Sequence, residues 1–131
     1  MVERVAAAIP SAARRFMTRH WPGALTLVVP AAGNVPHEVT AGTATVGVRW
    51  SSHPVATGLV TALGAPVTAP SANVTDGAPP TTVDQVRAYF DGKIALVLDG
   101  GPTAGGPPST VLDVTVEPAH VIRAGAVAVE Q

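Results

Sequence analysis

Hydrophobic and polar positions along this chain follow two different periods, one typical of helices and one typical of strands. Apolar spacing and capping residues predict helices at residues 2–9, 11–19, 53–63 and 82–90. Alternating or short apolar runs predict strands at residues 25–29, 45–50, 66–69, 94–98, 110–114 and 121–123. Because helices and strands alternate only imperfectly, we expect an α/β domain built on a mixed, twisted sheet.

Two helix ends carry specific signals. Thr82 and Gln85 fit a capping box at the start of the helix expected over 82–90. Gly64 follows the helix expected over 53–63 and suits a left-handed residue that ends a helix. The Gly-, Pro- and Thr-rich segments 31–44, 74–80 and 100–108 are predicted to be loops.

Composition limits the class of protein. The 131 residues contain no internal repeat and suit a single domain, residues 1–131, with 47% hydrophobic residues for its core. No cysteine is present, which excludes disulfides, thiolate metal sites and a thiol nucleophile. A net charge of −1 with 8 basic residues gives no electrostatic footprint for nucleic acid. The absence of a signal peptide or a long apolar run predicts a cytoplasmic protein with no membrane contact.

Polar residues at the ends of the predicted strands are the candidate binding groups. Ser71 and Asn73 follow the strand expected over 66–69, where α/β sheets present ligand-binding groups. Both side chains donate and accept hydrogen bonds without charge, although a simple turn would explain them equally well. Ser109 ends a Gly-rich loop that lacks the lysine of a phosphate-binding P-loop. This loop could place Ser109 over a ligand, and the alternative interpretation is a flexible loop without a binding role.

Two arginines are candidate anion-binding residues. A guanidinium at Arg49 could clamp a carboxylate or phosphate through two parallel hydrogen bonds, the alternative being a solvated arginine. Thr45 lies four residues earlier in the same predicted strand and should share its face. Arg123 is a similar candidate at the end of another strand. The histidines and aspartates show neither metal-ligand spacing nor paired carboxylates, so we predict no metal ligand and no catalytic side chain.

Taken together, several short blocks resemble the YrdC-like threonylcarbamoyl-AMP synthase family. They are Trp21-Pro-Gly-Ala-Leu-Thr-Leu-Val-Val29, Thr45-Val-Gly-Val-Arg49 with His53-Pro54, Ala69-Pro-Ser-Ala-Asn73 with Pro80-Thr81, Asp99-Gly-Gly101 running to Ser109-Thr110, and Ile122-Arg-Ala-Gly125. The resemblance extends from about residue 3 to residue 127. It implies a twisted sheet around a concave ligand cavity.

The resemblance also implies a reaction. Family members condense L-threonine, bicarbonate and ATP into threonylcarbamoyl-AMP and pyrophosphate, and a downstream tRNA-modifying transferase complex uses the product. The resemblance implies ATP as a substrate, together with Mg²⁺, and no tightly bound cofactor. The matching positions imply threonine binding by Arg49, Ala69 and Ser109. They imply ATP binding by Thr45, Ser71, Asn73 and Arg123.

The chain departs from the family pattern in one respect. It matches the C-terminal two-thirds of the domain and lacks both the Pro-Thr-x-Thr-x-Tyr-Gly strand and the Lys-x-Arg motif of the family. We therefore expect an N-terminally incomplete domain with little activity by itself. The alternatives are a carbamoyl-transfer enzyme of a related family and a non-catalytic module that binds double-stranded RNA. The charge of −1 predicts weak or absent direct binding of tRNA.

Overall fold

The computed structural model describes residues 1–129 and contains two compact units. The first, here called the sheet unit, combines Met1–Val67 with the described residues from Pro107 onwards. The second, here called the loop unit, is Thr68–Gly106.

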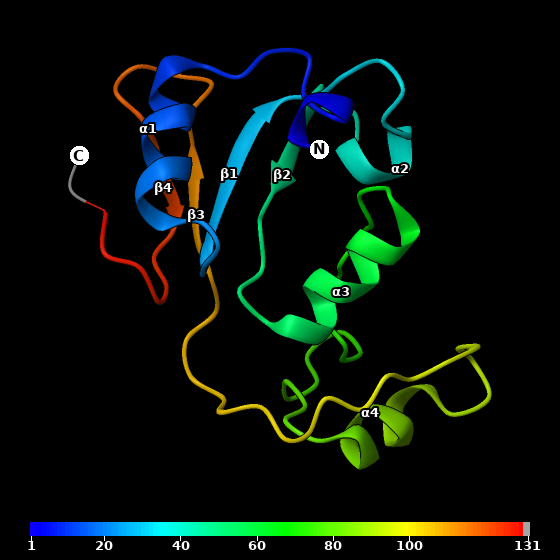
Figure 1. Cartoon of the computed structure of the whole chain (residues 1–131). Coiled ribbons are helices and arrows are strands. Elements are labelled where there is room, and N and C mark those ends of the chain that lie inside the picture. The colour runs from blue at the N-terminus through cyan, green and yellow to red at the C-terminus, as the bar shows by residue number, and fades with distance from the viewer. Residues whose placement is uncertain (130–131) are drawn as a thin grey trace. The chain divides into compact units, whose positions relative to one another are not determined.

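The sheet unit holds a short 3-10 helix, three α-helices and a four-stranded sheet (Figure 1). Its elements are η1 (Val2–Arg4), α1 (Ser11–His20), β1 (Leu25–Pro30), α2 (His37–Thr40), β2 (Thr45–Val48), α3 (Pro54–Leu63), β3 (Thr110–Asp113) and β4 (His120–Arg123). The strand order is β2-β1-β3-β4, with β1 and β3 parallel and the two outer pairs antiparallel. The predicted mixed α/β architecture is therefore confirmed.

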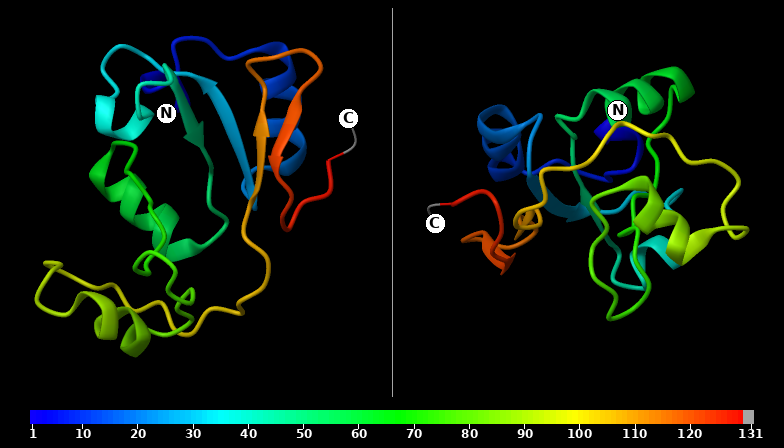
Figure 2. Two further views of the ribbon diagram at one scale, coloured as in Figure 1. Left: turned by 180° about the vertical axis from the view of Figure 1, so that it is seen from behind. Right: turned by 90° about the horizontal axis from the view of Figure 1, so that it is seen from below.

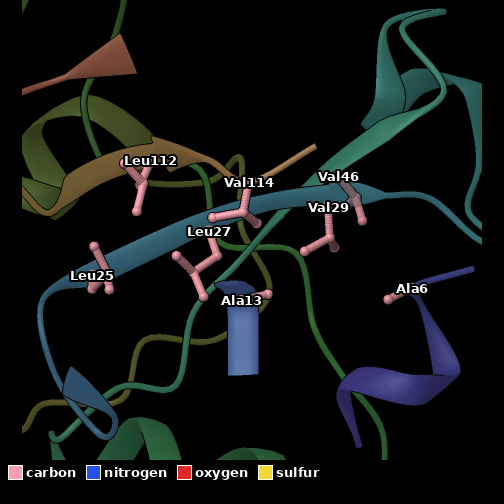
Figure 3. Packing of buried hydrophobic residues seen from close by; sticks show 8 residues of the cluster. All are labelled: Ala6, Ala13, Leu25, Leu27, Val29, Val46, Leu112 and Val114. Atoms are coloured by element: carbon pink, nitrogen blue, oxygen red, sulfur yellow. The ribbon is translucent and has the colours of Figure 1, made fainter. Parts of the chain in front are cut away.

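Alternate residues of β1 form the centre of the hydrophobic core. Leu25, Leu27 and Val29 are each 0% exposed. Figure 3 shows them together with the other buried side chains of the cluster, which are Ala6, Ala13, Val46, Leu112 and Val114. Helix α1 lies against this side of the sheet and contributes Ala13 from its buried face (Figure 1).

The opposite face of the sheet is less covered. Thr26 and Val28 lie between the core residues of β1 and are only half-buried. Residues Val111 and Asp113, their partners in β3, are half-buried too. The left view of Figure 2 shows no helix of the sheet unit in front of this face. Polar side chains on this face are therefore accessible to a ligand.

The N-terminal segment differs from the predicted helix over 2–9. Only Val2–Arg4 is helical, as a 3-10 turn. Ala6 instead forms a bridge with Ala31, and the Ala7 amide donates to the carbonyl of Pro30. Pairing with the end of β1 thus overrides the local helical spacing. Helix α2 also forms inside the segment that was predicted to be a loop.

The loop unit contains one regular element, α4 (Val83–Phe90). The strands predicted over 66–69 and 94–98 are absent from the described residues. Leu96 is 76% exposed, and no residue of Thr68–Gly106 is buried. A strand needs a neighbour for its backbone hydrogen bonds, and no segment of residues 1–129 pairs with either run. A strand-like sequence was therefore not sufficient for these two segments to form strands.

Both predicted helix-end signals are confirmed. The Thr82 hydroxyl accepts the amide of Gln85 at 3.4 Å, and the Gln85 side chain accepts the amide of Thr81 at 2.7 Å. This return bond reaches one residue further out than the usual capping box. Gly64 ends α3 with φ of 67°, in the left-handed region.

The contrast between β1 and the 94–98 segment can be tested by truncating one leucine in each. We expect Leu27→Ala to lower the free energy of unfolding by about 2–5 kcal/mol, because it leaves a cavity in the core. Leu96→Ala should change it by less than about 0.5 kcal/mol. Urea unfolding of both variants provides the measurement. Equal losses would mean that residues 94–98 are packed in solution.

Candidate functional site

Three of the predicted site residues lie at one end of the sheet. Arg49 follows the last residue of β2, Ser109 precedes the first residue of β3, and Arg123 ends β4. Because β2 and β4 run antiparallel to their neighbours, their C-terminal ends meet the N-terminal ends of β1 and β3. Residues distant in sequence are thereby brought to the same edge.

The same three residues also share the face opposite the core. The Thr26 and Ser109 hydroxyl oxygens are 2.9 Å apart, which places Ser109 on the face that carries Thr26. A Cβ added at Gly47 would lie 3.3 Å from the Thr26 methyl group, so Gly47 is on this face as well. Strand alternation, continued one residue beyond the end of β2, predicts the same face for Arg49.

Arg123 reaches this face because of an irregularity in β4. Val111 pairs with Arg123 while Leu112 pairs with Val121, so the register shifts by one residue between the two pairs. Val121 consequently packs against the core, and Arg123 points to the other side. Its Nε and Nη2 donate to the Ser109 carbonyl at 3.2 and 2.8 Å, and Nη2 also donates to the Ser109 hydroxyl at 3.2 Å.

Arg49 is oriented by the turn before β1. Its Nε donates to the Gly23 carbonyl at 2.8 Å, while the Gly23 amide donates to the Trp50 carbonyl at 2.8 Å. A Cβ at Gly23 would lie 2.3 Å from the His20 carbonyl oxygen, so only glycine fits there without a shift. The guanidinium is therefore fixed through Nε, and its terminal nitrogens are oriented with it.

Both arginines keep unused donors. Among residues 1–129, nothing accepts a hydrogen bond from Nη1 or Nη2 of Arg49 or from Nη1 of Arg123. Neither guanidinium lies within ion-pair distance of a described carboxylate. Two exposed cations without counter-ions at one end of one face favour an anionic ligand.

Thr45 lies at the other end of the same strand. It pairs with Pro30 of β1, and its hydroxyl is 2.8 Å from that of Thr43. Arg49 is four residues further along the chain, or roughly 13 Å away at the rise of an extended strand. The shared face predicted for both residues stays a prediction, and along the sheet they lie at opposite ends of β2.

The remaining predicted residues belong to the loop unit. Ala69 and Ser71 are exposed, and Asn73 is half-buried. The Asn73 amide nitrogen donates to the carbonyls of Val74 and Gly77 at 3.0 and 3.1 Å, as in the turn that was the alternative interpretation. Its carbonyl oxygen remains available, so Asn73 can accept a hydrogen bond from a ligand but has no free donor for one.

The described residues contain neither a metal-binding cluster nor a membrane-spanning helix. No group of three or more His, Asp or Glu side chains is placed to hold a metal ion within residues 1–129. In the same range, no helix has the length and apolar character needed to cross a bilayer.

Comparison with known proteins identifies the family. The Sua5/YciO/YrdC family model, described as telomere recombination, matches residues 1–125. This chain belongs to the Sua5/YciO/YrdC family. A threonylcarbamoyl-AMP synthase of Bacillus subtilis (strain 168) is 42% identical over 123 residues, covering 93% of this chain and 36% of the relative. That of Pyrococcus abyssi is 40% identical over 130 residues, covering 99% of this chain and 38% of the relative.

A solved structure agrees with this assignment. The crystal structure of P. abyssi Sua5 complexed with L-threonine aligns with a TM-score of 0.90 at 41% identity. The alignment covers 95% of this chain and 36% of that one. The family resemblance seen in the sequence is thus confirmed, and the chain spans less than two fifths of the length of these relatives.

Sequence reasoning missed Thr26 of this Sua5/YciO/YrdC chain. Its hydroxyl contacts Ser109 directly, and it lies between Leu25 and Leu27 in an otherwise apolar strand. A single hydroxyl at an outward position of a buried strand was the available signal. The role of the Gly23 carbonyl could not have been found in this way, because a backbone contact leaves no side-chain pattern.

The approach of the C-terminal segment to Ser109 depends on Gly125. A Cβ there would lie 2.2 Å from the Pro108 carbonyl oxygen and 2.7 Å from the Thr110 nitrogen. We expect Gly125→Ala to cost about 1–3 kcal/mol through overpacking. Gly33→Ala, where the added atom meets nothing within 4 Å, is the matched control. Thermal unfolding of both variants provides the measurement. Equal unfolding midpoints of the two variants would contradict the close approach at Gly125.

Proposed function

We propose that this chain forms substrate-binding parts of a threonylcarbamoyl-AMP synthase. One observation supports the proposal most: Arg49 and Arg123 present unpaired donors on one face, at one end of the sheet. The substrates of this reaction, L-threonine, bicarbonate and ATP, all carry negative charge on carboxylate, carbonate or phosphate oxygens. The names of the similar synthases favour this reaction over the related carbamoyl transfer.

The threonine side of the site is proposed to use Arg49, Ser109 and the backbone of Ala69. With Nε bound to Gly23, Arg49 would grip the carboxylate end-on through Nη1 and Nη2. The crystal structure of P. abyssi Sua5 complexed with L-threonine supports an amino-acid ligand in this family. Ser109 would add one hydroxyl hydrogen bond beside the arginine.

The nucleotide side is proposed to use Thr45, Ser71, Asn73 and Arg123. Arg123 would direct its free Nη1 at a phosphate, with Mg²⁺ entering on the triphosphate of ATP. Because the amide nitrogen of Asn73 is already bonded within its loop, this residue suits an amino or hydroxyl group better than a phosphate oxygen.

The proposed chemistry needs positioning rather than a protein nucleophile. To form the product, a carboxylate oxygen of N-carboxylated threonine displaces pyrophosphate at the α-phosphorus of ATP. Guanidinium groups held on a rigid sheet would orient the reactants and stabilise the charge that develops. A downstream tRNA-modifying transferase in the cytoplasm would then consume the product. The net charge of −1 argues against the alternative of an RNA-binding module.

Separate roles for the two arginines give a direct test. Arg49→Lys should weaken L-threonine binding about 10- to 150-fold, because lysine keeps the charge but loses the two-pronged contact, worth about 1.5–3 kcal/mol. Arg123→Ala should weaken ATP binding and leave L-threonine binding nearly unchanged. Calorimetric titration of each ligand against each variant provides the measurement.

The matched control for this test is Arg15→Lys, an exposed arginine on α1. The Arg15→Lys variant should bind both ligands with the same affinity as the unmodified chain. If Arg49→Lys and Arg123→Ala both lose ATP equally and neither loses L-threonine, the assigned roles are wrong. Absence of binding of both ligands to the unmodified chain would argue against the proposed function of this chain.

Turnover by the 131-residue chain alone should be low. The family resemblance implies cationic contacts from a Lys-x-Arg motif. The single lysine of this chain, Lys93, has no arginine two residues later and so does not form this motif. Without that charge stabilisation, phosphoryl transfer slows by several kcal/mol of barrier, or roughly three orders of magnitude. Pyrophosphate release from ATP, L-threonine and bicarbonate is the assay, and a rate equal to that of a full-length relative would contradict the expectation.

A further inference from the structure

We propose that Thr26 is a positioning residue that aims the Ser109 hydroxyl at an anionic group of the substrate. This inference rests on the proposed function, because it concerns how one of its binding groups is oriented. Thr26 lies in β1, an inner strand that pairs on both sides and whose alternate residues form the centre of the core. Its backbone position is therefore among the most constrained in the sheet unit.

The contact between the two hydroxyls is direct. Thr26 Oγ1 lies 2.9 Å from Ser109 Oγ, and Arg123 Nη2 lies 3.2 Å from the same Ser109 oxygen. Both interactions are on the sheet face opposite the core. Ser109 Oγ thus has two polar neighbours that come from two different strands.

Either hydroxyl can be the donor in the Thr26–Ser109 contact, and the proposed arrangement has Thr26 donating to Ser109. A guanidinium can only donate, so Arg123 occupies one of the two acceptor positions of Ser109 Oγ. Within residues 1–129, Ser109 Oγ is the one group in hydrogen-bond contact with the Thr26 hydroxyl. If Thr26 donates to it, the second acceptor position of Ser109 is filled. The proton of Ser109 is then free to be donated to a third partner.

This arrangement selects the chemistry of the ligand. Ser109 with both acceptor positions occupied can only donate further, so it suits a carboxylate or phosphate oxygen and not an ammonium group. Without the Thr26 hydroxyl, one acceptor position of Ser109 is vacant, and the Ser109 hydroxyl can turn its proton towards solvent instead of the ligand. Fixing the donor direction before binding reduces the entropy lost on binding.

Arg123 should depend much less on Thr26. Its Nε and Nη2 both donate to the backbone carbonyl of Ser109, at 3.2 and 2.8 Å, and that carbonyl is placed by the chain. A change at Thr26 should therefore affect the ligand of the Ser109 hydroxyl and not the ligand of Arg123. In the proposed function these are L-threonine and ATP, respectively.

The test compares Thr26→Val, which keeps the shape but removes the hydroxyl, with Thr26→Ser, which keeps the hydroxyl. Thr26→Val should weaken L-threonine binding about 3- to 10-fold by calorimetry, the usual effect of one hydrogen bond. Thr26→Ser should stay within about twofold, and ATP affinity should change little in either variant. Thr18→Val, an exposed α1 residue whose hydroxyl bonds to the carbonyl of Arg14, is the matched control.

Combining Thr26→Val with Ser109→Ala shows whether Thr26 acts through Ser109. The double variant should bind L-threonine no more weakly than Ser109→Ala alone. Fully additive losses would overturn the proposal, as would an equal effect of Thr18→Val. So would a loss of L-threonine affinity in Thr26→Ser as large as that in Thr26→Val.

A ligand-free measurement separates failure of this inference from failure of the proposed function. The Hα–Hβ scalar couplings of Ser109, measured by NMR, report its side-chain rotamer. We expect one dominant rotamer in the unmodified chain and in Thr26→Ser, and averaging between rotamers in Thr26→Val. Unchanged couplings in Thr26→Val would overturn the inference even if L-threonine binds. A change would support it even if no L-threonine binding is found.

Discussion

The alternation of side chains along β1 is the constraint on which the sheet unit depends. Leu25, Leu27 and Val29 are fully buried against α1, and this leaves Thr26 and Val28 on the other face. A register slip of one residue would place Thr26 in the core and expose the leucines. The large cost of that exchange fixes the register. The hydrophobic core therefore determines which polar groups reach the candidate binding face.

How much of this fold the sequence could predict depended on whether local signals agreed with long-range pairing. The residues of β1 and α1 combine a clear period with a partner in the structure, and both elements form near their expected bounds. The 94–98 segment has an equally strong strand pattern but no partner among residues 1–129. Residues 2–9 have helical spacing but pair with Ala31 instead. Periodicity shows what a segment can become, whereas pairing decides whether it does so.

The site shows the same limit at the level of single residues. Strand alternation predicts that Thr45 and Arg49 share a face, and this stays a prediction because Arg49 lies one residue beyond the end of β2. Alternation within β4 alone would have placed Arg123 beside Val121, towards the core. The register shift opposite Val111 and Leu112 places Arg123 on the other face, and the local sequence contains no signal that predicts this shift. The positions of Ala69, Ser71 and Asn73 in one site with these residues stay predictions, since they belong to the other unit.

The two units differ in what holds their binding groups in place, and this difference has a consequence for binding. Groups on the sheet are attached to a buried core, whereas no residue of Thr68–Gly106 is buried. Ordering a residue costs about 1–2 kcal/mol of backbone entropy. The hydrogen bonds of the loop unit, such as those of Asn73 to its own turn, return only about 1 kcal/mol each. Under the proposed function, ligand groups that contacted Ser71 or Asn73 would therefore contribute ordering free energy that contacts to Arg49 and Ser109 would not require. On that proposal, the residues of the sheet unit would contribute most of the binding free energy, and those of the loop unit would contribute less per contact.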